Sequence, residues 1–137
     1  MAKHYSGNIE KETLKNNYFR HVLFTGKHAQ LVVMSVDPGQ DLGNEVHPKV
    51  DQFFRIESGI AEFILNNGKD KHIAKDGFAV IVPAGTWHNV VNIGKKKLKL
   101  YTIYSPPNHP PGTIHKTKAD AERAEKAGKD VYRPGKR

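Results

Sequence analysis

The sequence contains no cysteine, which excludes disulfide bonds, thiolate zinc sites and cysteine nucleophiles. Long apolar runs are also missing, since the longest, Phe78-Ala-Val-Ile-Val82, is far shorter than the roughly 18 residues of a membrane span. The opening residues, Met1-Ala-Lys-His-Tyr5, lack the apolar stretch of a secretory signal. With 137 residues, 37% hydrophobic and 26% charged, the chain has room for one domain with a modest core. We therefore expect a single-domain cytoplasmic protein without membrane contact.

The central part of the chain has no excess of basic residues, although the formal net charge of the whole chain is +8. Residues 21–94 carry six lysines and arginines against eight aspartates and glutamates. The positive charge lies at the two ends and in Lys95-Lys96-Lys97 with Lys99. A nucleic-acid-binding domain more often presents a basic stripe interleaved with aromatic residues. The charge pattern therefore favours solvated lysines, and we expect no nucleic-acid partner.

Short runs rich in β-branched and aromatic residues fill the chain from about residue 20 to residue 104. Glycine, proline and asparagine turns separate these runs, among them Asp37-Pro-Gly39 and Asn66-Asn-Gly68. The predicted strands cover residues 28–36, 52–57, 60–65, 78–82, 87–93 and 98–104. Strands at this spacing indicate an antiparallel sandwich or barrel, and therefore an all-β fold.

The composition changes after Tyr104. Four prolines between residues 105 and 112 exclude a central strand or a helix there. Thr117-Lys-Ala-Asp120 resembles a capping box and predicts a short alanine-rich helix over residues 119–127. The expected organisation is an N-terminal segment, a barrel, and a Pro-rich segment with a short helix and a basic tail, over residues 1–19, 20–104 and 105–137.

The C-terminal region is expected to pack against the barrel, because its prolines reduce the entropy lost on ordering. Residues 129–137 are polar and expected to fray. His109 and His115 are interpreted as exposed side chains, with gating of access to the barrel as the alternative role.

Two of the eight histidines, His47 and His88, stand in segments with regularly placed glycines. Glu45 and His47, at positions i and i+2, share one face of an extended segment. The first segment reads Gly39, five residues, Glu45-Val-His47, four residues, Gln52, six residues, Gly59. The second reads Gly77, five residues, Pro83-Ala-Gly85, two residues, His88, three residues, Asn92. Taken alone, these histidines fit either a metal site or a turn residue and a hydrogen-bonded core residue.

The two segments resemble the paired motifs of the cupin family. The first family motif has His-x-His and Glu between its glycines, and the second has Pro-x-Gly, His and Asn, which this chain matches at every fixed position. The resemblance extends over about residues 20–104. It implies a jelly-roll barrel, also called a double-stranded β-helix, with one metal at its mouth. The corresponding ligands in this chain are Glu45, His47, Gln52 and His88.

Two of these four positions depart from the family pattern, since Glu45 replaces the first histidine and Gln52 replaces the glutamate. Two imidazoles, one carboxylate and one amide oxygen suit one divalent transition metal per chain, Mn, Fe, Co, Ni or Zn, with positions left for water or substrate. The resemblance implies a metal-dependent enzyme that acts on a small polar oxygen-bearing metabolite by isomerase, cyclase or dioxygenase chemistry. Tyr104 and His109 are the acid–base candidates. A non-catalytic module that binds a small molecule or a metal is the alternative.

Alternation along two predicted strands assigns side chains to the interior of the barrel. The side chains expected inside are Gln52, Phe54, Ile56, Leu98, Leu100, Thr102 and Tyr104. Arg55, Glu57, Lys97 and Lys99 are expected to face solvent, and Trp87 fits either the core or the rim.

Apolar residues on the outer faces also need cover. Phe53, Ile60 and Ile64 are expected there. Pairing of two copies would bury these side chains and protect edge strands, so we expect a homodimer.

Overall fold

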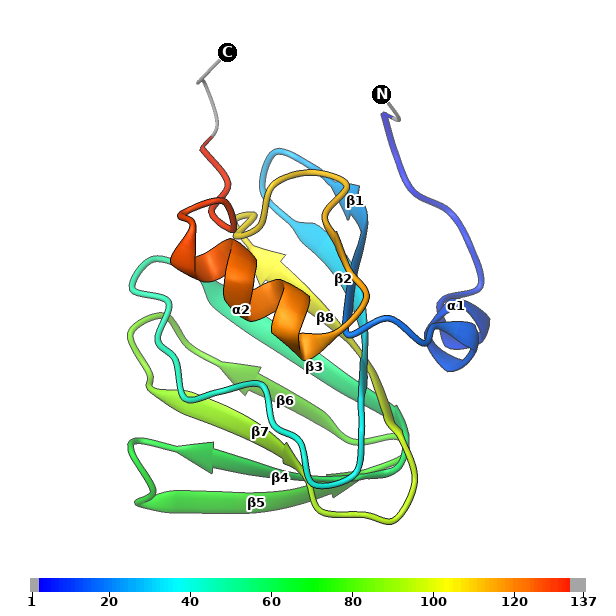
Figure 1. Ribbon diagram of the computed structural model, residues 1–137, viewed down its shortest axis with the longest axis vertical. Helices are drawn as coiled ribbons and strands as arrows, with labels where there is room; N and C mark the ends of the chain where they lie inside the picture. Colours follow the sequence, from blue (N-terminus) through cyan, green and yellow to red (C-terminus); the bar gives the residue numbers. More distant parts are fainter. Residues whose placement is uncertain (1–2, 134–137) are drawn as a thin grey trace.

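In the computed structural model, which describes residues 3–133, two antiparallel sheets face each other (Figure 1). The larger sheet has the strand order β6-β3-β8-β2-β1-β9, and the smaller has the order β5-β4-β7. The strands are β1 (Arg20–Thr25), β2 (Gln30–Val36), β3 (Asp51–Ser58), β4 (Ile60–Leu65), β5 (Asp70–Lys75), β6 (Ala79–Val82), β7 (His88–Asn92), β8 (Leu98–Ser105) and β9 (Ile114–His115). This architecture confirms the predicted all-β jelly roll.

The core lies between the two sheets and follows the predicted alternation of side chains. Phe54 of β3 and Phe63 of β4 meet edge to face, with 5.1 Å between ring centroids and 74° between ring planes. Each buried aromatic ring of this size contributes about 1.5–3 kcal/mol by leaving water. All side chains expected inside are buried, namely Gln52, Phe54, Ile56, Leu98, Leu100, Thr102 and Tyr104.

A tight approach between strands explains one glycine of the first motif. Gly59 joins β3 to β4 with φ of +94°, a conformation that side chains with a Cβ rarely adopt. A Cβ at this position would lie 3.0 Å from the Cα of Leu98 and from the carbonyl oxygen of Lys97. Only glycine lets the chain turn there without displacing β8.

Helix α1 (Ile9–Lys15) covers part of the outer face of the larger sheet and was not predicted (Figure 1). Asn8 caps it by accepting a hydrogen bond from the Lys11 backbone N–H at 3.0 Å. With seven residues and no regular apolar face, the helix has too weak a pattern for recognition from sequence.

The cover provided by α1 overturns two expectations. Lys99 faces outward but is only 9% exposed, and its Nζ donates to Asn17 Oδ1 at 2.9 Å and to the carbonyl of Asn16, which ends α1. Glu57 is only 8% exposed and lies 3.8 Å from an Arg55 nitrogen. The predicted direction of both side chains holds, but the predicted solvent exposure is wrong because α1 contacts β3 and β8.

Strands β1 and β5 were not among the predicted strands. Ala74 is the only buried residue of β5, so this edge strand lacks the alternation that marks a half-buried strand. Trp87 is 42% exposed, so of its two expected positions it takes the rim. No helix within residues 3–133 has the length and apolar character needed to cross a membrane.

The C-terminal region packs on the barrel, as predicted. Strand β9 pairs with β1, and helix α2 (Lys118–Lys126) lies in front of β3 and β8 (Figure 1). Both halves of the capping box between Thr117 and Asp120 are formed. The expected exposure of His109 and His115 is wrong, because they are only 4% and 8% exposed. Of the tail expected to fray, residues 134–137 lie outside the described residues, whereas Asp130 bonds to His109.

Candidate metal centre

Backbone hydrogen bonds bring the two motif segments together at the mouth of the barrel. The N–H of Glu45 donates to the carbonyl of His88 at 2.9 Å, and the N–H of His88 donates to the carbonyl of Glu45 at 2.9 Å. The N–H of Gly85, which has φ of +83°, donates to the carbonyl of His47 at 2.9 Å. These three bonds hold the segments in register and bring their side chains to one place.

Three of the four predicted ligands form one cluster. The ligand atoms of Glu45, His47 and His88 all lie within 4.8 Å of one another. Oε1 of Glu45 lies 3.3 Å from Nε2 of His47 and 3.8 Å from Nε2 of His88. Two imidazole nitrogens that converge on one carboxylate oxygen form a typical donor set for a divalent transition metal.

The fourth predicted ligand, Gln52, is buried on β3 with its amide turned in a defined direction. Its Nε2 donates to Thr102 Oγ1 at 2.9 Å, while its Oε1 is buried without a hydrogen-bond partner among the described residues. Nε2 of His47 and Nε2 of His88 are likewise buried and unpartnered. Buried polar atoms are rarely left unpaired, so three electron-pair donors without partners fit the requirement of a bound cation.

Hydrogen bonding prepares His88 for the role of a ligand. Its Nδ1 lies 3.0 Å from the carbonyl oxygen of Thr86. A carbonyl only accepts, so Nδ1 carries the hydrogen and Nε2 keeps its lone pair for a metal. Burial lowers the pKa of His88 and favours the neutral ring that metal binding requires.

Glu45 supplies the negative charge of the cluster. Burial opposes its ionisation, but the contact with His47 and the charge of Arg20 outweigh this effect and lower the pKa of the carboxyl. An ionised carboxylate beside two imidazole rings forms a donor set that fits a divalent metal.

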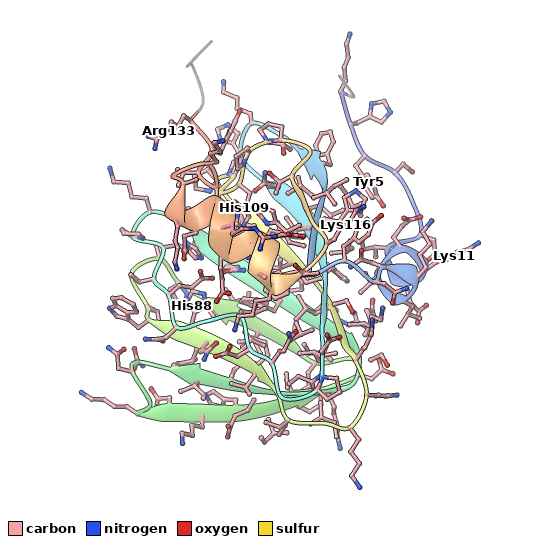
Figure 2. All side chains as sticks on the ribbon, viewed as in Figure 1. Tyr5, Lys11, His88, His109, Lys116 and Arg133 are labelled. Atoms are coloured by element: carbon pink, nitrogen blue, oxygen red, sulfur yellow. The ribbon has the colours of Figure 1, made fainter. Side chains whose placement is uncertain are left out.

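The two acid–base candidates, Tyr104 and His109, lie next to the cluster and contact each other. The ring of Tyr104 meets that of His47 edge-on, with 5.7 Å between centroids. Its hydroxyl donates to Nε2 of His109 at 3.1 Å, and Nδ1 of His109 donates to Asp130 Oδ1 at 2.9 Å. Burial raises the pKa of Tyr104, so the hydroxyl stays protonated. In Figure 2, His109 appears in the region of α2 and His88 lower on the barrel.

A cavity of about 700 Å³ lies between the barrel mouth and the C-terminal region. Its lining includes Glu45 and His47 from the first motif and Ala121 from α2. Arg20, His109 and Asp130 also line it. The sequence did not predict Arg20 or Asp130 as residues of this cavity. They come from opposite ends of the chain, and no sequence spacing indicates that the fold brings them together.

Comparisons with known proteins agree with this architecture. Residues 32–104 match the model of the cupin domain. The uncharacterized protein YrkC of Bacillus subtilis is 53% identical over 122 residues, which cover 86% of this chain and 66% of YrkC. The uncharacterized protein L612 of Acanthamoeba polyphaga mimivirus is 49% identical over 112 residues, which cover 80% of this chain and 70% of L612. The chain thus spans about two thirds of the length of these relatives.

One solved structure is similar to this protein over most of both chains. The crystal structure of BH2720 from Bacillus halodurans has 47% sequence identity and a TM-score of 0.86, and the match covers 88% of this chain and 94% of that one. The family match, the paired motifs and the jelly roll agree. This chain belongs to the cupin family.

Proposed function

We propose that this protein binds one divalent transition metal at Glu45, His47, Gln52 and His88, and that it is a metal-dependent enzyme acting on a small polar oxygen-bearing metabolite. The reaction is of the isomerase, cyclase or dioxygenase type. The cytoplasmic location and the homodimer expected from the sequence remain parts of this proposal.

The observation that carries the proposal is the set of buried electron-pair donors without partners. Nε2 of His47, Nε2 of His88 and Oε1 of Gln52 have no hydrogen-bond partner among the described residues. Each would be a costly defect in a barrel whose only role was structural, at about 1–3 kcal/mol per unpaired buried group. A metal held by Glu45, His47, Gln52 and His88 would satisfy all three.

The residues of the chain divide the work of such a site. Glu45 offsets part of the metal charge, while Thr86 and Thr102 orient the ring of His88 and the amide of Gln52. When bound, a divalent ion supplies Lewis-acid polarisation of a ligand oxygen. The cavity beside Glu45 and His47 offers room for a metabolite.

The metal content of the purified protein tests the proposal. Protein purified without added metal, and protein reconstituted with Mn, Fe, Co, Ni or Zn salts, would be measured by elemental analysis after gel filtration. We expect close to one ion per chain. A chain that stays free of metal after reconstitution with all five ions would contradict the proposal.

A non-catalytic binding module is the second candidate, and one observation favours it. The hydroxyl of Tyr104, one of the two acid–base candidates, is buried and bonded to the other candidate, His109, so Tyr104 itself does not open onto the cavity. Mass spectrometry of small molecules released from the purified protein separates the two functions. A ligand recovered unchanged after incubation with metal-loaded protein supports binding, whereas its conversion supports an enzyme.

A further inference from the structure

Arg20, the first residue of β1, places a guanidinium group in the wall of the cavity that also contains Glu45 and His47. Its side chain is only 7% exposed. The ring of Phe19 lies 5.3 Å from the guanidinium carbon, on one face of the group. A cation so far from water requires partners for its charge and for its hydrogens.

The protein meets these requirements only in part. A guanidinium has five N–H donors. Nη1 bonds to Nδ1 of His115 at 3.2 Å, whereas Oδ2 of Asp130 lies at 3.6 Å, beyond the usual hydrogen-bond length. Nε is buried and has no partner among the described residues. Asp130 is also shared, because its other oxygen accepts from His109.

An incompletely satisfied guanidinium is suited to a carboxylate, whose two oxygens match two parallel N–H groups. The other cations of the cavity are less suited to this role. Lys118 is already paired with Asp41, and Lys49 is exposed, where an ion pair is weak. Glu122 and Glu125 are exposed on α2.

We propose that Arg20 binds the carboxylate of a small organic acid, and that a second oxygen-bearing group of this acid reaches the metal beside Glu45 and His47. The inference rests on the proposed metal site, and it narrows the ligand from a polar metabolite to an acid with two separated oxygen functions. Asp130 then serves as the counter-charge of Arg20 while the cavity holds no acid.

Calorimetric titration of metal-loaded protein tests this inference. The protein would be loaded with Mn(II) and its metal content counted before oxalate, malonate, succinate and glutarate are added. We expect one length to bind best and its monoamide to bind about tenfold more weakly, because an amide loses the charge-assisted pair with Arg20. Arg20→Gln is expected to lose about tenfold or more in affinity for the best acid, with its metal content unchanged.

Two further variants control for folding and for charge. Arg20→Lys keeps the positive charge but loses the two parallel N–H donors of the guanidinium. Its affinity for the best acid is expected to lie between those of wild type and Arg20→Gln, so it provides the test if the glutamine variant does not fold. Lys49→Gln removes a charge from the exposed side of the same cavity and is expected to stay within about twofold of wild type.

The inference is overturned if metal-loaded wild type binds none of the acids, if Arg20→Gln binds the best acid as tightly as Lys49→Gln does, or if inorganic phosphate binds as tightly as that acid. The absence of metal from the wild-type protein would instead refute the proposed metal site. The metal count therefore separates the two failures.

Discussion

Replacing Gln52 by glutamate tests the departure of this chain from the usual cupin ligands. The change keeps the side-chain shape and converts a neutral amide oxygen into a carboxylate. Gln52 is only 1% exposed, and its Oε1 has no hydrogen-bond partner among the described residues, so in the proposed ligand set the new charge is buried and shares the metal with Glu45. The hydroxyl of Thr102, which now accepts from Nε2, can rotate and donate to the carboxylate.

The expected gain in metal affinity follows from the balance of two terms. A unit charge about 4 Å from another is worth about 4 kcal/mol at an effective dielectric constant of about 20. The metal-free variant would hold a proton on one of its two neighbouring carboxyl groups, and releasing this proton costs about 1.4 kcal/mol for each unit of pKa above the assay pH. If the pKa of that carboxyl group lies about one unit above the assay pH, subtracting the cost of proton release from the gain in charge interaction leaves about 2.6 kcal/mol. This corresponds to about a hundredfold tighter metal binding.

The same change is expected to destabilise the metal-free protein, because a buried carboxyl group is added beside another. We expect its free energy of unfolding to fall by about 2 kcal/mol. Competition with a chromophoric chelator measures the affinity, and urea unfolding with EDTA measures the stability. Gln40→Glu is the control, since it adds a carboxylate on a loop outside the cluster.

The affinity for the metal is expected to rise while the stability of the metal-free protein is expected to fall, so each measurement checks a different step of the reasoning. If Gln52→Glu binds the metal no more tightly than wild type or Gln40→Glu, then Oε1 of Gln52 is not a ligand. If the affinity rises while the stability of the metal-free protein stays unchanged, the reasoning about burial at this position is wrong.

Four other predictions test the cluster, the buried histidines, the C-terminal region and the outer surface. His88→Ala should weaken metal binding by about a hundredfold, because one of four ligands contributes roughly one quarter of the 10–16 kcal/mol measured for four-ligand zinc sites. Equilibrium dialysis measures this loss of affinity, and a much smaller loss would contradict the role of His88 as a ligand. With EDTA present, the free energy of unfolding should fall as the pH is lowered from about 7 to about 5, because burial lowers the pKa of His88, His109 and His115, and each gains its proton more readily when unfolded. Urea titrations at each pH measure this slope, and a flat profile would contradict the assignment of these rings as neutral. Amides of residues 113–127 should exchange hydrogen more slowly than a free peptide, because β9 pairs with β1 and α2 packs beside it; exchange at the free-peptide rate would show an undocked segment. Light scattering at tens of micromolar should give the mass of a homodimer, and a monomer mass would refute the pairing expected from the outer apolar residues.

Much of the barrel and the position of the cluster are determined by features local in the sequence. A strand alternates its side chains between two faces, so Gln52 and Phe54 point inward together wherever β3 lies. Turn residues such as Gly59 end the strands because their φ values are inaccessible to most side chains. The spacing of the two motifs then brings Glu45 and His88 into one backbone bridge. The resemblance to cupins supplied the expectation that these residues share a metal.

The tertiary structure alone decides which polar groups from distant segments share the buried interior. Lys99 is covered because α1 packs across its strand, and no local pattern around residue 99 reports that helix. Arg20 and Asp130 meet although they come from opposite ends of the chain. Such pairs depend on how the ends close over the barrel. Desolvation and charge pairing act through space, and they leave no periodic signal along the sequence.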